Sequence, residues 1–514
     1  MSWRESNRTI VVWKFLGGIP LSLLSVLAIY GQSHGGVAHP RAQPRLNTDT
    51  SSAIVVHMPR GTYRSLVCRD FYTAANGEWL DTAVLPTDAT VADTSPTLGE
   101  RQDTISLSSW ETLKVSGQRT MIRLLSHART VAATTTDPVL RVLGTFYGSC
   151  LVSPPQQSGQ SAQPGQPTQP GSGAPEADSG VARCVMATRQ SLESVLSRAY
   201  LQYATTPATV ARVRALTEQL RDAMAIRIRA LPTLSPVTRA QAEKKLAQMR
   251  FLIAAPEHDI GYDTLTLSPT DYTANLAAIH YVDYHKTLER QTDPDTTLRP
   301  SVSSYTINAF YRANINAIEI PVTMFQEPWY NPARNTTENY AGLGMVLGHE
   351  LSHAFDGEGF RGDTTDTATW TQRERAAYQI EAHKLIAEYD RFVVGDAHVS
   401  GERTLHENVA DLGGVNVAFD VYMRAVKAGT VDVDRTTPGV AQPTPAQRFF
   451  LTYAGVWRVK ARPKHGLDGV LDVHSAHQWR VNGVLAAMPA FAQAFGCKAG
   501  DPMALAAADR PLLW

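Results

Sequence analysis

The chain has 514 residues, more than one hydrophobic core usually holds, so two or three domains or lobes are expected. Lys plus Arg and Asp plus Glu both number 48, and hydrophobic residues make up 43% of the chain, which is ordinary for a folded protein. This composition argues against global disorder, and the absence of a basic excess argues against a nucleic-acid partner.

One long apolar run lies near the start of the chain, FLGGIPLSLLSVLAIY at residues 15–30, and basic residues precede it. The run is short for a membrane span, and its basic flank is typical of a secretory signal. We therefore expect residues 1–30 to be a signal peptide or a membrane anchor, two alternatives that the sequence leaves open. Polar residues 31–53 are expected to be a disordered tether. Either way the rest of the chain is exported, to the periplasm, the extracellular space or the outward face of a membrane.

Four cysteines fit an exported chain, because disulfides persist in oxidising compartments. They predict two disulfides, for which the residues alone allow three pairings. The alternative is that some of them are buried free thiols.

The exported part is divided by a change in composition. Residues 54–153 carry enough apolar side chains to fold. Residues 154–180 contain no aromatic residue and no Leu, Ile, Val or Met, so they cannot bury a core. We expect a disordered linker there.

The remainder is predicted to be mostly α-helical with a small β-sheet, an α+β fold. Apolar residues recur at helical spacing from Arg183 to Met249, which predicts a helical lobe over residues 181–300. The stretch from Tyr305 to Pro321 alternates and predicts a strand. Helices dominate the rest of the last segment, residues 301–514.

The strongest motif is His-Glu-Leu-Ser-His at residues 349–353. Its surroundings have helical character, so His349 and His353 lie one turn apart on the same face. Two imidazoles at that spacing can bind one Zn²⁺, while Glu350 beside them can polarise a water. A pair of ordinary surface histidines is the alternative.

A catalytic zinc needs a third protein ligand and an open position. In the stretch LHENVADLGG, Glu407 and Asp411 are four residues apart and face the same way on a helix. One of them can bind the metal while the other holds a ligand histidine, although such a pair alone is usually a solvated helix face. Gly413 and Gly414 allow this helix to approach another one closely.

The two motifs, in this order, resemble those of the neprilysin family of zinc metallopeptidases. The resemblance covers nearly the whole exported chain and implies a gluzincin catalytic lobe over residues 301–514, with the N-terminal part of the peptidase fold at residues 54–153. Six further blocks occur in family order: CRDFYTAANGEWL, FYGSC, RCV, INAFYRANINAIEIP, DVHSAHQWRVNG and AFGCKAGDPM.

This resemblance implies a role for each matching residue of the two motifs. His349, His353 and Glu407 would bind one Zn²⁺ per chain. Glu350 would be the general base, and Asp411 would orient His349.

Residues outside the two motifs also receive roles from the resemblance. His474 would stabilise the oxyanion, and Arg480 would donate a hydrogen bond to a substrate carbonyl. Asn308 and Ala309 would form the edge on which the peptide is laid as an added strand. The residue after the scissile bond would enter an apolar pocket formed by Met324, Trp329, Met345, Val346, Val456 and Trp457. Such a pocket predicts cleavage before bulky hydrophobic residues.

The resemblance also selects one of the three cysteine pairings. It implies a disulfide between Cys68 and Cys497 and another between Cys150 and Cys184. The second bridge would close a loop around the predicted linker.

The chain departs from the family between Cys150 and Arg183. Relatives carry there a helical lobe that caps the cavity, whereas this chain has the linker. We expect a shortened cap lobe and a more open site that accepts longer or partly folded substrates. The rival expectation is that the loss has weakened the enzyme.

The sequence thus predicts an exported zinc endopeptidase that acts on peptides or proteins. The alternative is a catalytically weak or inactive metal-binding envelope protein that serves as a binding or scaffold module. All implied ligands and catalytic residues are present, which favours the enzyme. Trimming from chain ends is a third possibility that the sequence does not address.

Overall fold

A computed structural model describes residues 58–83, 106–153, 176–255, 261–292, 300–356, 370–432, 442–461 and 472–514. The predicted signal or anchor, the tether and most of the predicted linker lie outside these ranges. Helix α4 begins at Glu176, so the last residues of the predicted linker are helical. Among the described ranges there is no helix long and apolar enough to cross a membrane.

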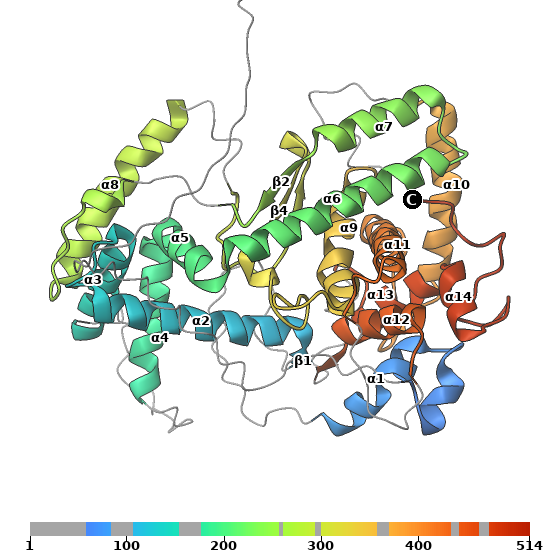
Figure 1. The fold of residues 1–514 in the computed structure, drawn as a ribbon, viewed down its shortest axis with the longest axis horizontal. Coiled ribbons are helices and arrows are strands. Elements are labelled where there is room, and N and C mark those ends of the chain that lie inside the picture. The colour runs from blue at the N-terminus through green and yellow to red at the C-terminus, as the bar shows by residue number, and fades with distance from the viewer. Residues whose placement is uncertain are drawn as a thin grey trace, which may run out of the picture. The chain divides into compact units, whose positions relative to one another are not determined.

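The described residues are mostly helical with small sheets, which confirms the predicted fold class (Figure 1). Their buried apolar side chains form one continuous hydrophobic cluster. The α-helices are α1 (Phe71–Thr82), α2 (Ser109–Val131), α3 (Pro138–Val152), α4 (Glu176–Ser191), α5 (Glu193–Ala204), α6 (Pro207–Ala230), α7 (Pro236–Gln248), α8 (Tyr272–Thr292), α9 (Met345–His353), α10 (Gln372–Tyr389), α11 (Leu405–Lys427), α12 (Pro445–Val456), α13 (His477–Ala486) and α14 (Pro489–Phe495). The strands are β1 (Ser106–Ser108), β2 (Arg250–Ile253), β3 (Phe310–Arg312), β4 (Ala317–Ile320), β5 (Val393–Val394), β6 (Ala397–His398) and β7 (Val459–Ala461).

The strand predicted from Tyr305 to Pro321 is a hairpin of two short strands. Strands β3 and β4 pair antiparallel, with Phe310 opposite Glu319, and β2 pairs parallel to β4 on its other side. A 3₁₀ turn joins the two strands and ends at Asn316, whose φ of 47° is in the left-handed region that Asn tolerates better than most residues. In this sheet β3 is therefore an edge strand.

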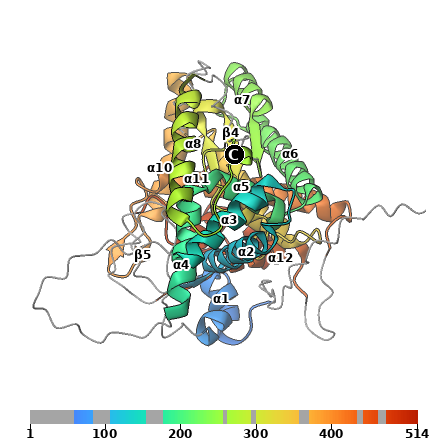
Figure 2. The ribbon, with the colours of Figure 1, turned by 90° about the vertical axis from the view of Figure 1, so that its left-hand side faces the viewer.

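Helices α9 and α11 cross where two glycines meet. A Cβ atom on Gly348 would lie 2.8 Å from the carbonyl oxygen of Gly414, and one on Gly414 would lie 2.6 Å from the backbone nitrogen of His349. Because no larger residue fits at these distances, the close approach expected of the second helix depends on glycine. Helix α6 packs along both helices (Figure 1), and Figure 2 shows α7 beside α6.

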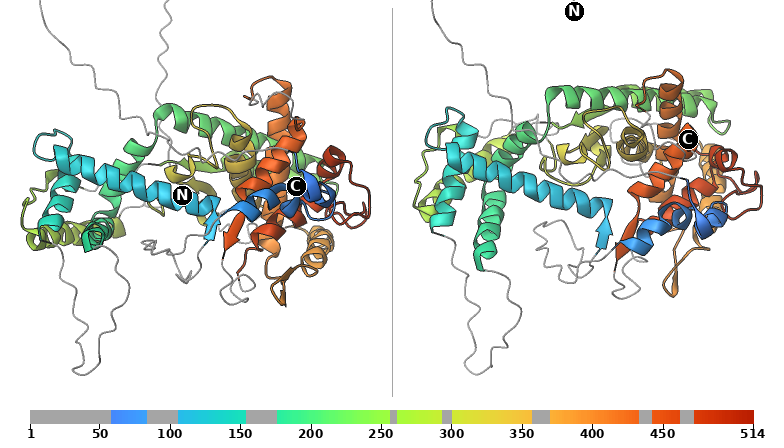
Figure 3. Two further views of the ribbon diagram at one scale, coloured as in Figure 1. Left: turned by 90° about the horizontal axis from the view of Figure 1, so that it is seen from below. Right: turned by 60° about the horizontal axis from the view of Figure 1, so that its bottom comes forward.

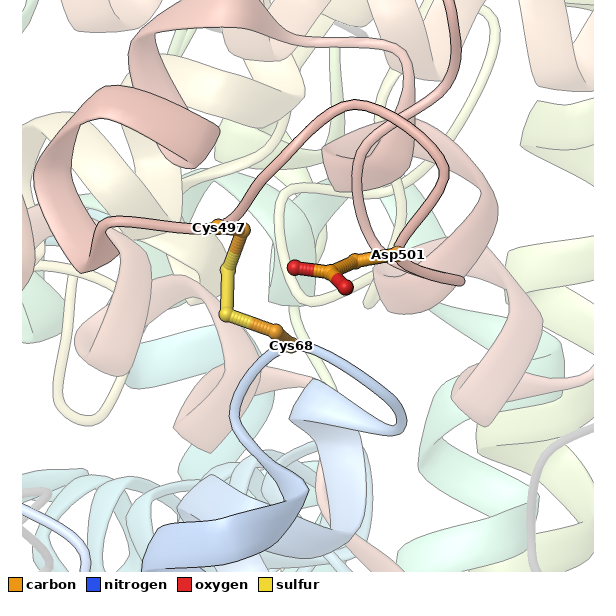
Figure 4. Close-up of side chains that lie close together, drawn as sticks. All are labelled: Cys68, Cys497 and Asp501. Atoms are coloured by element: carbon orange, nitrogen blue, oxygen red, sulfur yellow. A yellow bond between two sulfur atoms is a disulfide. The ribbon is translucent and has the colours of Figure 1, made fainter.

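The N-terminal helix α1 packs against α12 and α13, as Figure 3 shows for the blue helix and the orange-red ones. A disulfide joins Cys68, three residues before α1, to Cys497, two residues after the end of α14, and the carboxylate of Asp501 lies beside it (Figure 4). Because the two sulfur atoms are bonded to each other, this group is not a metal site. A second disulfide joins Cys150 on α3 to Cys184 on α4. Both pairings implied by the resemblance are confirmed.

Candidate active site

Helix α9 carries the two histidines of the HELSH motif. It continues from a π-helical turn at Asn339–Gly344 and ends at His353. The Nε2 atoms of His349 and His353 lie 3.0 Å from each other. The predicted helical spacing therefore does bring both imidazoles to one point.

Helix α11 brings a carboxylate to the same point. Oε2 of Glu407 lies 3.2 Å from Nε2 of His349 and 3.6 Å from Nε2 of His353. Within the described ranges, these three residues are the one group with metal-ligand geometry other than the disulfide cysteines with Asp501. We call the three atoms the ligand triangle.

A second carboxylate holds the far nitrogen of each histidine. Oδ1 of Asp411 lies 2.8 Å from Nδ1 of His349, and Oδ2 of Asp356 lies 2.7 Å from Nδ1 of His353. Each Nδ1 thus donates to a carboxylate, which leaves the lone pair of each Nε2 facing the triangle. The resemblance predicts Asp411 in this role but gives none to Asp356, whose spacing of three residues from His353 is the signal that could have identified it.

The ligand triangle fits Zn²⁺. Zinc binds His nitrogen and Glu oxygen at about 2.0–2.2 Å in a tetrahedron, which separates the ligand atoms by roughly 3.3 Å. The observed separations of 3.0, 3.2 and 3.6 Å lie around that value. Without a cation, two nitrogen lone pairs and a carboxylate oxygen would repel each other, and Oε2 of Glu407 is buried without a well-directed hydrogen bond.

Arg480 on α13 supports this site from the core. Its Nε and Nη2 atoms donate to the carboxylate of Asp411 at 2.7 and 2.6 Å, and its guanidinium lies 4.1 Å from the centre of the Trp457 ring. Burial alone would raise the pKa of Asp411, but Arg480 and His349 outweigh burial and lower this pKa to about 2. Arg480, expected to contact the substrate, is therefore also a partner of the carboxylate that holds His349.

His474 lies just before α13 and reaches the triangle. Its Nε2 atom is 3.1 Å from Oε2 of Glu407, and its Nδ1 atom is 3.0 Å from Oδ1 of Asp472. Burial opposes a charge on this imidazole, yet the two carboxylates raise its pKa to about 9. Its side chain is 44% exposed, so it faces the solvent side of the site.

A cleft of about 470 Å³ opens over the ligand triangle. Glu350 lines it together with His349, His353 and Glu407. The chain from Asn308 to Ala313, which includes the edge strand β3, forms another part of its lining. The cleft therefore joins the ligand triangle to the edge strand of a sheet.

The predicted apolar pocket is only half present in this cleft. Met345, Val346 and Trp457 line it. The other three predicted residues are buried in the core and are not part of its lining; they are Met324, Trp329 and Val456. The ring of Trp329 meets that of Trp457 edge-on at 5.8 Å and so supports the wall from behind.

The chain is similar to known proteins over the part that carries this site. Two family models, both described as Peptidase family M13, match residues 168–256 and 308–510. Mouse membrane metallo-endopeptidase-like 1 is 29% identical over 335 residues, which cover 62% of this chain and 43% of that protein. Human neprilysin is 27% identical over 338 residues, which cover 62% and 44%. Among solved structures, zinc metalloprotease Zmp1 of Mycobacterium tuberculosis in its open state has a TM-score of 0.58 at 27% identity, covering 65% of this chain and 52% of that one.

The chain spans less than half the length of these two curated relatives. The two family matches nevertheless cover more than half of its residues, and they include the ligand triangle and the chain along the cleft. The chain belongs to peptidase family M13, the neprilysin family.

Proposed function

We propose that this chain is a zinc-dependent endopeptidase with one Zn²⁺ bound by His349, His353 and Glu407. The observation that carries the proposal is the ligand triangle at the floor of a cleft that also holds Glu350. Zinc bound there would polarise a water molecule and the substrate carbonyl.

Glu350 is the group that moves the proton. It follows His349 on α9, is 6% exposed and lines the cleft. A carboxylate in this position takes a proton from the attacking water and passes it to the leaving amine nitrogen. The other two carboxylates of the lining are engaged, because Glu407 meets the histidines and Asp356 holds His353.

His474 and Arg480 are placed to stabilise charge that develops on the substrate oxygen. Both line the cleft, and each is held by a carboxylate, His474 by Asp472 and Arg480 by Asp411. Donors that are already oriented stabilise an oxyanion without reorganising during the reaction.

The substrate binds in an extended form along the chain that runs from Asn308 into β3. An exposed strand edge offers main-chain groups to an added strand, whatever the side chains of the peptide. Met345, Val346 and Trp457 give the cleft an apolar wall, which favours a bulky hydrophobic residue after the scissile bond.

We also propose that the protein is exported and that its site admits long or partly folded chains. Two disulfides support an oxidising compartment, and the predicted N-terminal signal or anchor agrees with it. The short stretch between Cys150 and Cys184, which are 34 residues apart, lies where the resemblance expects the helical cap lobe and supports a reduced cap over the cleft.

The test measures zinc content and cleavage of a mixed peptide library and of an intact unfolded protein by the full chain. We expect about one zinc per chain, cuts before bulky apolar residues, and cleavage of the unfolded protein. His353→Ala should lose both zinc and cleavage, whereas His398→Ala, at an exposed position in β6, should keep both. Bound zinc without cleavage of any substrate would favour the binding or scaffold module.

A further inference from the structure

A buried carboxylate lies in the sheet that carries the cleft edge, and the proposed chemistry does not use it. Glu319 is in β4, between Ile318 and Ile320, and is 2% exposed. A charged group is costly to bury unless it is paired and hydrogen-bonded. Its partners therefore indicate why a glutamate occupies this position.

Both oxygens of Glu319 have partners. Oε1 accepts from the backbone nitrogens of Ser301 at 2.7 Å and Val302 at 3.2 Å. Oε2 accepts from Oγ of Ser301 at 2.6 Å and pairs with Nη1 of Arg312 at 3.4 Å. One carboxylate thus joins the chain that precedes the cleft edge to the last residue of β3.

The contacts of Glu319 with Ser301 and Val302 fix the path of the chain just before the edge strand β3. The backbone nitrogen of Ser304 donates to Oγ of Ser197 on α5 at 2.8 Å, next to the Ser301 and Val302 contacts with Glu319. This segment leads directly into Asn308, where the lining of the cleft begins. Its position is therefore set before the chain reaches the cleft.

The second partner fixes where the edge strand ends. Arg312 pairs with Ala317 in the register of β3 and β4, and its side chain reaches diagonally to Glu319. Diagonal pairs of this kind hold two strands in register. Glu319 therefore holds the chain along the cleft on both sides of the residues that would meet a peptide.

We propose that Glu319 is a positioning residue for the peptide-binding edge, and that it acts through Arg312 and the segment at Ser301 and Val302. This inference rests on the proposed peptidase function. Each further residue of an extended peptide adds main-chain contacts along an edge. The loss of this positioning therefore weakens the binding of long peptides more than that of short ones. The zinc ligands do not contact Glu319, so zinc binding and the chemical step are unaffected.

The experiment compares Glu319→Gln with the unchanged chain, both full length and zinc-loaded. For a long peptide we expect KM to rise about 5–10-fold, which corresponds to about 1–1.4 kcal/mol of lost binding free energy, with kcat and zinc content unchanged. A short peptide that meets only the first residues of the edge should show a smaller rise. Glu381→Gln is the matched control, because Glu381 is also buried and accepts from a backbone nitrogen and a basic side chain, but on α10.

Binding measured without cleavage separates this inference from the proposed function. In a Glu350→Gln background, a labelled long peptide should bind less tightly when Glu319→Gln is added. Equal binding, or an equal loss for short and long peptides, would overturn the role of Glu319 alone. No peptide binding in the Glu350→Gln background would overturn the peptidase assignment as well. If Glu319→Gln does not fold, Arg312→Gln tests the same contact, and Arg312→Lys should restore part of the affinity.

Discussion

Asp411 binds His349 and Arg480 at the same time. Its Oδ1 atom lies 2.8 Å from Nδ1 of His349 and 2.6 Å from Nη2 of Arg480, and its Oδ2 atom lies 2.7 Å from Nε of Arg480. One fully buried carboxylate on α11 thus connects a proposed zinc ligand on α9 to α13. The orientation of His349 therefore depends on a helix that carries none of the three residues of the ligand triangle.

Asp411→Asn should lower zinc affinity by about 10–100-fold, as is usual when a carboxylate behind a ligand histidine is lost. The amide cannot offset the charge of Arg480. The buried guanidinium is then left without a counter-charge, which should also lower the free energy of unfolding of the protein. Zinc affinity is measured by competition with a chelator. Asp420→Asn is the control, because Asp420 lies on the same helix and pairs with Arg227 at a partly exposed position. Unchanged zinc affinity in Asp411→Asn would refute the connection.

Removal of zinc should destabilise the fold, because the three ligand atoms repel each other without a cation. Bound metal stabilises the folded state by about 4 kcal/mol when free zinc is 1,000 times its Kd. We expect a chelator to lower the Tm and added zinc to restore it, and calorimetry measures both Tm values. Glu350→Gln should show the same shift, since Glu350 is not a ligand, and His353→Ala should show none. A Tm that does not respond to zinc in the unchanged chain would contradict the ligand triangle.

Glu374 should make the protein sensitive to acid. It lies in the first turn of α10, where it completes a capping box with Thr371, and it also accepts from the backbone nitrogen of Ser235 and the hydroxyl of Thr238 at the start of α7. Burial would raise its pKa, but these hydrogen bonds lower it to about 2 from 4.5. Because the folded pKa is the lower one, the stabilisation is present above pH 4.5 and is lost as the pH falls toward 2.

Glu374→Gln should therefore lower the free energy of unfolding by about 1–3 kcal/mol near neutral pH, because the donors that now bind its carboxylate would lose a charged acceptor. The cost should shrink below pH 4.5, which denaturant unfolding across pH measures. Glu243→Gln on α7 removes only a surface pair with Arg229 and should cost less than about 1 kcal/mol at any pH. A cost for Glu374→Gln that stays constant with pH would show that the charge is not responsible.

The sequence predicts the metal site better than the pocket beside it. The HELSH spacing places His349 and His353 on one face of a helix, and the resemblance adds Glu407 and Asp411. The structure brings these four residues together. The pocket is predicted less well because an apolar residue that lines a cleft and one in the core have the same chemistry. Val346 lines the cleft, for example, whereas Trp329 lies in the core.

The partners of Glu319 and the hairpin turn at Asn316 depend on tertiary packing, which the sequence pattern does not indicate. Nothing about Glu319 in an apolar strand indicates that its partners lie at Ser301, Val302 and Arg312. The single predicted strand becomes a hairpin because Asn316 adopts a left-handed conformation, which no periodicity reveals.

Glu350 is the proposed base that moves a proton beside a zinc held by the ligand triangle. The most direct test measures cleavage rate and bound zinc for the unchanged chain and for Glu350→Gln, which keeps the ligands and removes the base. We predict equal zinc content and a rate at least about 100-fold lower in the variant. Equal rates in the two proteins, or loss of zinc in Glu350→Gln, would contradict this role.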